Sequence, residues 1–378
     1  MPSPCTVWGG WKIWWYSWQA LPVRRTCRRA KKAVLIFCAD NGVVAEGVTQ
    51  TTQAVTAAVT RNFTKGIASV NALSRVCGAD VFPVDIGVAE ELHCDGIISR
   101  KIAAGTRNFA HEPAMTREQA ERAILTGIAL VGEKVAAGYN LIITGEMGIG
   151  NTTTSSAVFS VLQQLPPEQV TGRGAGLSGA GLRHKVEVIA KAIALHQPDR
   201  NDVLDVLSKV GGLDICGMAG AFLGGAVYHV PVLIDGFISA VAANCAVRLA
   251  SLCRQYLFAS HCSKEPAGKL ALEALGLRAY LDCDMCLGEG TGGVIGAKLF
   301  DFALAAYGEI AGFDADGKSS LWKNYNRQYR INHSGKGEMY MKYQTTNLQP
   351  TKRYPTYQFH ARTAQKKLPA EQVFCICV

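Results

Sequence analysis

The chain has 378 residues, 48% of them hydrophobic, which is enough to bury one large core or two. Its formal charge of +9 comes from its ends, because residues 1–32 carry +7 and residues 318–378 carry +9, which leaves about −7 on residues 33–317. The body is therefore mildly acidic, and we expect no nucleic-acid partner for it.

The first segment, residues 1–32, holds five of the six tryptophans and no acidic residue. Its apolar stretch "CTVWGGWKIWWYSWQALPV" lacks the basic start and the cleavage site of a signal peptide. No run in residues 33–317 is long and apolar enough to predict a transmembrane helix. We therefore expect no membrane partner.

Five apolar runs that are rich in β-branched residues predict strands in the body: "AVLIFCADNG", "VFPVDIG", "NLIITGEMG", "VPVLIDG" and "QYLFASH". The stretches between them have helical spacing. One of these stretches opens with a capping box, Thr116 and Gln119, and closes near Gly138. Strands that alternate with helices predict an α/β fold with a parallel sheet flanked by helices.

Acidic residues recur where the predicted strands end, at Asp40, Asp85, Glu146 and Asp235. In open α/β sheets, ligands bind in the crevice beyond the carboxyl ends of the strands. A helix cap would explain one such acid equally well. Four in one chain predict the rim of a site.

Two glycine-rich loops lie in the middle of the chain. In "GEMGIGNTTTSSA", residues 145–157, the backbone can turn tightly and present its N–H groups to an anion at a helix N-terminus. In "TGRGAGLSGAGLRHK", residues 171–185, Arg173 and Lys185 add cations. A helix cap and a surface linker remain alternatives, but together the loops predict a site for a phosphorylated sugar.

A third glycine-rich loop, "CLGEGTGG", carries the carboxylate of Glu289. No bulky neighbour blocks the approach of a flat substrate to it. Partial desolvation would raise the pKa of Glu289 toward a value suited to a general base. The alternative is a turn residue that caps a helix starting near Thr291.

The thirteen cysteines are scattered singly through apolar runs, which predicts reduced, buried thiols of a cytosolic protein. Cys283 and Cys286 form a lone CxxC without the second pair of a zinc ribbon. We therefore predict no metal site.

Between about residues 33 and 316, eight motifs occur in an order known from one family: "ADNGVVAEGVTQTTQAVT", "GTRNF" with "PAMT", "TGEMGIGNTTTSSA", "TGRGAGL", "VGGLDICGMAGA", "VLIDGFIS", "ASHCSKEPAG" and "LGEGTGG". By these motifs the chain resembles nicotinate-nucleotide:dimethylbenzimidazole phosphoribosyltransferases of cobalamin biosynthesis. The resemblance implies transfer of phosphoribose from nicotinate mononucleotide to dimethylbenzimidazole, which gives α-ribazole phosphate and nicotinate. It also implies a cytoplasmic homodimer without a cofactor.

The resemblance also implies roles for particular residues. Glu289 is the general base and Glu146 is the second catalytic carboxylate. The substrate-binding positions are Gln53, Gly148, Gly150, Asn151, Thr152, Gly174, Gly176, Lys185, Asp214, Asp235 and Leu287. Two alternatives stay open: a different azole or purine-like acceptor, and a chain that binds nucleotide without turnover.

The fold that the resemblance implies is a Rossmann-like parallel sheet with a small helical domain drawn from both chain ends. We expect this small domain to be incomplete, because the family's "KPPGSLGRLE" segment is absent. Residues 33–317 are the predicted transferase domain, residues 1–32 are foreign to the family, and residues 318–378 are a basic tail predicted to be disordered.

The tryptophan cluster suggests a cause for the foreign start. Back-translated and shifted in frame, residues 6–19 can encode S-L-G-R-L-E and a following helix, so we interpret residues 6 to about 23 as the family helix read in the wrong frame. The body departs from the family pattern at three places: Asn41 replaces a histidine, Cys286 replaces an arginine, and Ser178-Gly179 replaces a more acidic pair.

Overall fold

The computed structural model describes residues 30–309 of the chain. The predictions that concern the N-terminal segment, the frame shift, the small helical domain and the basic tail lie outside the described residues. The predicted segment boundaries also lie near or beyond these limits and stay predictions.

The predicted parallel sheet is confirmed. It has six strands in the order β3-β2-β1-β4-β5-β6, and all neighbouring strands are parallel. The strands are β1 (Lys32–Ala39), β2 (Ala79–Gly87), β3 (Ile98–Ser99), β4 (Leu141–Met147), β5 (Val232–Ile234) and β6 (Leu257–Ala259). The five predicted runs form all of them except β3, which is two residues long and too short to carry a pattern.

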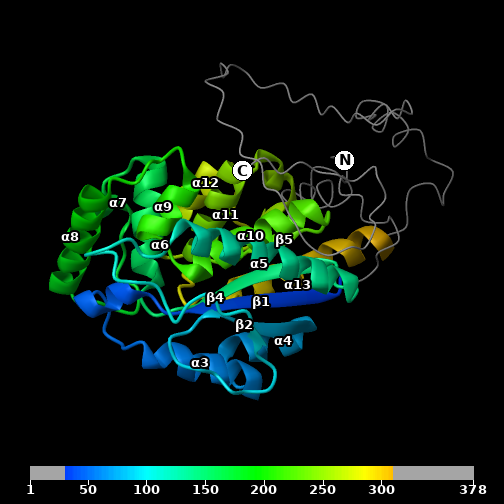
Figure 1. The fold of residues 1–378 in the computed structure, drawn as a ribbon. Helices are drawn as coiled ribbons and strands as arrows, with labels where there is room; N and C mark the ends of the chain where they lie inside the picture. Colours follow the sequence, from blue (N-terminus) through cyan, green and yellow to red (C-terminus); the bar gives the residue numbers. More distant parts are fainter. Residues whose placement is uncertain (1–29, 310–378) are drawn as a thin grey trace, which may run out of the picture.

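Helices cover both faces of the sheet, as Figure 1 shows for α5 and α10 on one side and α3 and α4 on the other. The helices that precede β5 are η1 (Gly42–Glu46), α3 (Ala54–Lys65), α4 (Ser69–Cys77), α5 (Arg117–Ala136), α6 (Asn151–Gln163), α7 (Pro167–Val170), α8 (Gly179–His196), α9 (Val203–Val210) and α10 (Leu213–Val227). Those that follow it are α11 (Phe237–Leu249), η2 (Ser251–Tyr256), α12 (Gly268–Ala274) and α13 (Thr291–Glu309).

The first strand explains why the core has two halves. All eight residues of β1, "KAVLIFCA", are buried. Leu35 and Phe37 face the half built with α5, α10 and α11, whereas Val34 and Ile36 face the half built with α3, α4 and α13. A strand that is buried on both faces reads as a continuous apolar run, which is typical of parallel sheets.

The pair α5 and α10 packs with almost no side chains between the two backbones. A Cβ added to Gly220 would lie 2.8 Å from the carbonyl carbon of Ile124, and one added to Gly127 would lie 2.7 Å from the backbone nitrogen of Ala221. The close contact between these two helices fixes α10, whose first turn reaches the carboxyl end of the sheet.

The predicted start of α5 is confirmed, because Thr116 Oγ1 accepts from Gln119 N at 3.1 Å and Gln119 Oε1 accepts from Thr116 N at 2.8 Å.

The strand order also places the site. The chain leaves β1 toward β2 and later returns to the other side of β1 with β4, which is the strand order of Rossmann folds. The crevice where this order reverses lies between the carboxyl ends of β1 and β4. Among residues 30–309, no helix combines the length and apolar character needed to cross a membrane.

Candidate active site

A cleft of about 310 Å³ lies at the carboxyl edge of the sheet, and Glu146, Asp235 and Glu289 line it. The prediction that four strand-end acids form one rim is half right. Asp40 and Asp85 are buried, but they do not line the cleft. Asp40 Oδ2 accepts from the amide of Ala89 at 2.8 Å, so it braces the chain that follows β2.

The loop after β4 is shaped by glycines that have no room for a side chain. A Cβ at Gly148 would lie 2.9 Å from Asp214 Oδ2 and would also press on the backbone of Ala39. Gly150 has a φ of 92°, a left-handed conformation that favours glycine, and it directly precedes Asn151, the first residue of α6. The loop therefore presents the N-terminus of a buried helix to the cleft, as an anion site requires.

Asn151 joins two buried carboxylates. Its Nδ2 donates to Glu146 Oε2 and also, at 3.0 Å, to Asp214 Oδ2. Burial and, to a smaller extent, the nearby charge of Asp214 raise the pKa of Glu146 to about 8, although the bond from Asn151 opposes the rise. Burial likewise raises the pKa of Asp214 to about 6. Asp214 lies behind the cleft and acts on it through Asn151.

Lys185 reaches the same end of the cleft from α8. Its fully buried Nζ donates to Thr152 Oγ1 at 2.9 Å and to the carbonyl oxygen of Gly172 at 3.1 Å. A Cβ at Gly174 would lie 3.5 Å from this ammonium group. Burial lowers the pKa of Lys185 to about 8, partly offset by the charge of Glu265. The two glycine loops thus meet around one buried cation, and their role in binding a phosphate stays a prediction.

The loop of Glu289 lies over the end of β4. Glu289 has a φ of 63°, an uncommon conformation for a residue other than glycine. A Cβ at Gly145 would lie 2.7 Å from the carbonyl oxygen of Glu289, so a glycine in β4 is what lets the loop approach. Gly288 in turn contacts the side chain of Glu146, which brings the two proposed catalytic carboxylates to one wall of the cleft.

The carboxylate of Asp235 holds this loop in place. Its Oδ2 accepts from the amide of Gly290 at 3.1 Å and its Oδ1 accepts from the amide of Gly293 at 2.8 Å. Asp235 therefore caps the first turn of α13, which begins at Thr291 as expected. Because Asp235 makes these bonds, the alternative that Glu289 serves as the cap is not needed.

Glu289 itself is half-buried, and its Oε2 lacks a hydrogen-bond partner within residues 30–309. Burial raises its pKa, the amide of Val70 in the first turn of α4 opposes the rise, and the charge of Asp235 adds to it. A raised pKa is what we expect for a general base that works near neutral pH.

The structure brings most of the predicted site residues together. Those that line the cleft are Glu146, Gly148, Gly150, Asn151, Thr152, Gly174, Asp235, Leu287 and Glu289. Four others do not line it: Lys185 and Asp214, which act from behind, and Gln53 and Gly176. Gln53 Nε2 donates to the carbonyl oxygen of Asn41 at 3.1 Å, and the carbonyl oxygen of Gly176 accepts from Gln50 Nε2 at 2.9 Å. Their substrate contacts stay predictions.

The structure shows the environment of the residues that depart from the family pattern. Asn41 is fully buried, and its Nδ2 donates to the carbonyl oxygen of Ile149 at 3.3 Å, which supports the loop after β4. Cys286 is exposed at the edge of the cleft. Ser178 caps α8 through its bond from the amide of Gly181 at 3.1 Å.

Sequence reasoning missed several residues of the cleft wall. His261, Ser263 and Glu265 follow β6 and line the cleft, together with Phe237 and Ser239 from the start of α11. The available signal was the polar end of the fifth predicted strand at Ser260 and His261, which follows the same rule as the other strand ends.

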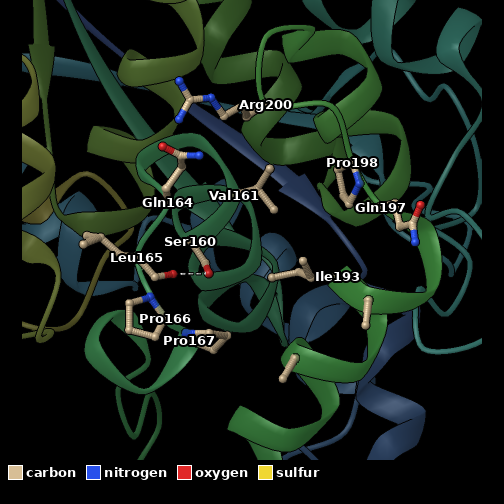
Figure 2. Close-up of a pocket in the computed structure, with 12 residues that line it drawn as sticks. Ser160, Val161, Gln164, Leu165, Pro166, Pro167, Ile193, Gln197, Pro198 and Arg200 are labelled. Carbon is tan, nitrogen blue, oxygen red and sulfur yellow. Dashed lines mark hydrogen bonds between the residues drawn. The ribbon is translucent and has the colours of Figure 1, made fainter.

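A larger cavity, of about 600 Å³, lies between the end of α6 and the end of α8 (Figure 2). Its wall contains Val161, Leu165, Ile193 and Arg200, but no carboxylate, histidine or cysteine. General acid–base chemistry has no group to work with there, so the smaller cleft is the candidate active site. Within the part of the chain that the structure describes, the nine cysteines are all free, and no group of three or more His, Cys, Asp or Glu side chains could hold a metal ion.

The raised pKa of Glu146 predicts an unusual dependence of stability on pH. The folded-state pKa, about 8, exceeds the ordinary value of 4.5, so the folded state binds this proton more tightly than the unfolded state. That contribution is complete below the ordinary value and is lost as the pH rises toward 8. We expect the melting temperature of the ligand-free chain to fall between pH 6 and pH 8, and to fall less in Glu146→Gln. Thermal scans across this range measure both.

A matched control is Glu187→Gln, which changes an exposed carboxylate on α8. This variant should follow the wild-type curve. Parallel curves for wild type and Glu146→Gln would show that Glu146 does not titrate in this range.

Comparisons with known proteins agree with this geometry. A family model described as "Phosphoribosyltransferase" matches residues 13–317. A nicotinate-nucleotide–dimethylbenzimidazole phosphoribosyltransferase of Acetivibrio thermocellus is 51% identical over 75% of this chain and 81% of its own length. One of Ruminiclostridium cellulolyticum is 49% identical over 79% and 84%.

Solved structures agree as well. A crystal structure of CobT from Thermus thermophilus superposes with a TM-score of 0.80 at 39% identity, over 85% of this chain and 96% of that one. One assignment accounts for the sheet, the cleft, the matched family model and the relatives that are about 50% identical in sequence. The chain belongs to the phosphoribosyltransferase family of nicotinate-nucleotide–dimethylbenzimidazole phosphoribosyltransferases.

Proposed function

We propose that the chain transfers phosphoribose from nicotinate mononucleotide to dimethylbenzimidazole and releases α-ribazole phosphate and nicotinate. The relatives that carry this activity in their names match three quarters or more of the chain. The observation that carries the proposal is the placement of Glu289. Its carboxylate lines the same cleft as the N-terminus of α6, and its pKa is raised by burial.

In the proposed reaction, Glu289 accepts the N–H proton of dimethylbenzimidazole while the other ring nitrogen attacks the anomeric carbon. A new carbon–nitrogen bond forms as the bond to nicotinate breaks, and the electron pair of that bond leaves with nicotinate. Attack from the face opposite the leaving group converts a β-nucleotide into an α-product. A base whose pKa is raised holds the transferred proton better near neutral pH.

The nucleotide is proposed to bind with its phosphate at the N-terminus of α6 and beside Lys185. The donors there are the hydroxyl of Thr152 and the backbone of Gly174, which line the cleft, and the ammonium group of Lys185, which lies behind them and is bonded to Thr152. Glu146, with a pKa of about 8, is mostly protonated at neutral pH and offers the ribose both a donor and an acceptor.

The acceptor end supports a flat, apolar base. Val59, Met147 and Leu287 line the same cleft as Glu289, and 58% of the Leu287 surface is exposed. Another azole or a purine-like ring fits the same description, so this alternative is kept. A homodimer in the cytoplasm and the absence of nucleic-acid, membrane and cofactor partners are part of the same proposal.

The decisive experiment is an assay of the purified chain with nicotinate mononucleotide and dimethylbenzimidazole. Liquid chromatography with mass detection should show α-ribazole phosphate and nicotinate in equal amounts. Parallel reactions with imidazole and adenine test the alternative acceptor. Nucleotide binding by calorimetry without any product would contradict the proposal and favour a chain that binds without turnover. Light scattering of the same sample measures the oligomeric state.

A further inference from the structure

The nucleotide end of the cleft contains a carboxylate that the proposed mechanism does not use. Glu265 lines the cleft from the segment between β6 and α12. Its Oε2 is buried and makes no hydrogen bond within residues 30–309. A Cβ at Gly172 would collide with this oxygen, so the carboxylate lies against the same loop to which Lys185 donates a hydrogen bond.

Lys185 needs a nearby negative charge, because a buried ammonium group without a counter-charge is costly. Its two bonds go to neutral oxygens, of Thr152 and Gly172. No carboxylate of the described residues lies within ion-pair distance of Lys185, and Glu265 is the charge that acts on it. Lys185 and Glu265 therefore compensate each other's charge over a distance longer than that of an ion pair. The loop of residues 172–174 lies beside them.

A phosphate bound at this end of the cleft would contact the same groups with which Glu265 interacts in the ligand-free chain. The charge of Lys185 and the amide of Gly174 are the two influences that oppose the raised pKa of Glu265. Both are also the donors proposed above for the phosphate of the nucleotide. One negative group can satisfy them at a time, since two close anions repel each other.

We propose that Glu265 is a positioning residue for the phosphate: its carboxylate keeps Lys185 charged in the empty cleft and gives way when the phosphate of the nucleotide takes over as counter-ion. This inference rests on the phosphoribosyl transfer proposed above, since it assumes a phosphorylated ligand at this end of the cleft. It assigns Glu265 no contact with the reacting atoms.

Glu265→Gln should have two opposite effects on nucleotide affinity. Removal of a negative charge that competes with the phosphate should tighten nucleotide binding while Lys185 stays protonated. Loss of its counter-charge should also lower the pKa of Lys185, which is already reduced to about 8, so at higher pH the variant loses its cation earlier than the wild type. The two affinity curves should therefore cross.

Calorimetric titration with nicotinate mononucleotide, and separately with inorganic phosphate, measures this in the intact chain. Near pH 6.5 we expect Glu265→Gln to bind the nucleotide roughly three- to tenfold more tightly than wild type, the size expected for removal of one screened like charge. Above the pKa of Lys185, near pH 8.5, we expect it to bind more weakly than wild type. Because binding is measured, the result is independent of whether the chain also catalyses transfer.

The other ionisable groups near this end of the cleft are the same in wild type and Glu265→Gln, so their effects on nucleotide affinity cancel when the two chains are compared. They are the exposed pair Lys264 and Asp284, and, along the cleft, Glu146, Asp235, His261 and Glu289. Glu265→Asp keeps the charge and should restore the wild-type pH dependence. Glu273→Gln is the matched control, since Glu273 is an exposed residue of α12 that pairs only with Lys269 at 3.7 Å among the described residues.

Uniformly weaker binding of Glu265→Gln at both pH values would overturn the inference and indicate a merely structural role. Equal binding by wild type and variant at both values would overturn it too. So would a wild-type chain that binds neither probe, whatever its activity with other substrates.

Discussion

Glu289→Gln is expected to lower kcat by about 10²- to 10⁴-fold, the usual contribution of a positioned general base. The amide keeps the shape of the side chain, so the left-handed loop at residue 289, with its φ of 63°, should persist. It cannot accept the proton that the attacking base must lose. Affinity for nicotinate mononucleotide should stay near the wild-type value, because Glu289 is not one of the proposed phosphate donors, which include Lys185 and Thr152. Steady-state kinetics and calorimetry measure the two effects separately.

Glu273→Gln again serves as the matched control, since it changes a carboxylate outside the cleft. It should leave both kcat and nucleotide affinity unchanged. A Glu289→Gln chain that keeps most of its turnover at neutral pH would remove Glu289 from the role of base. A loss of nucleotide binding together with turnover would instead indicate a change in the loop.

Gly220→Ala is expected to destabilise the chain by about 2–3 kcal/mol, as overpacking of a tight contact does. The Cβ would lie 2.8 Å from the carbonyl carbon of Ile124 and 3.0 Å from the Cα of Gly127, both of which are backbone atoms that cannot rotate away. Helix propensity alone predicts the opposite sign, since alanine favours a helix interior by about 1 kcal/mol over glycine. The melting temperature should fall by roughly 4–10 °C.

Gly179→Ala is a control for this prediction. Gly179 begins α8, and a Cβ there would meet only Arg183 Nη1, at 3.9 Å. Its melting temperature should equal or exceed that of the wild type. If both variants are equally stable, α5 and α10 do not pack as closely as the structure shows.

The parts of the fold that could be predicted are those that local patterns encode. The five longer strands appear as apolar runs, and the start of α5 appears as a capping box at Thr116. The short strand β3 has no such pattern, because its pairing with Val84 and Asp85 is decided by contacts distant in sequence.

The candidate site was predicted where glycine and acid occur together, as at Glu146 and Glu289. The function of Asp235 could not be separated from theirs in this way. Each of the three acids stands beside a glycine in the sequence, and only the bonds from Gly290 and Gly293 identify Asp235 as the residue that holds the loop. Glu265 lies inside the motif "ASHCSKEPAG", but it was missed as a site residue because it stands beyond a strand end, in a segment without a periodic pattern.

The position of β1 has a consequence for synthesis of the protein on the ribosome. This strand is made before either of its sheet neighbours, yet it pairs with both β2 and β4. About 100 residues separate its end from the end of β4, which at a typical rate of translation takes roughly 5–20 s. During that time one edge of the apolar segment "KAVLIFCA" has no strand to pair with, and such a segment can pair with other chains. We expect newly made chains to depend on a general chaperone at this stage, and to aggregate more readily in extracts depleted of chaperones than in complete ones.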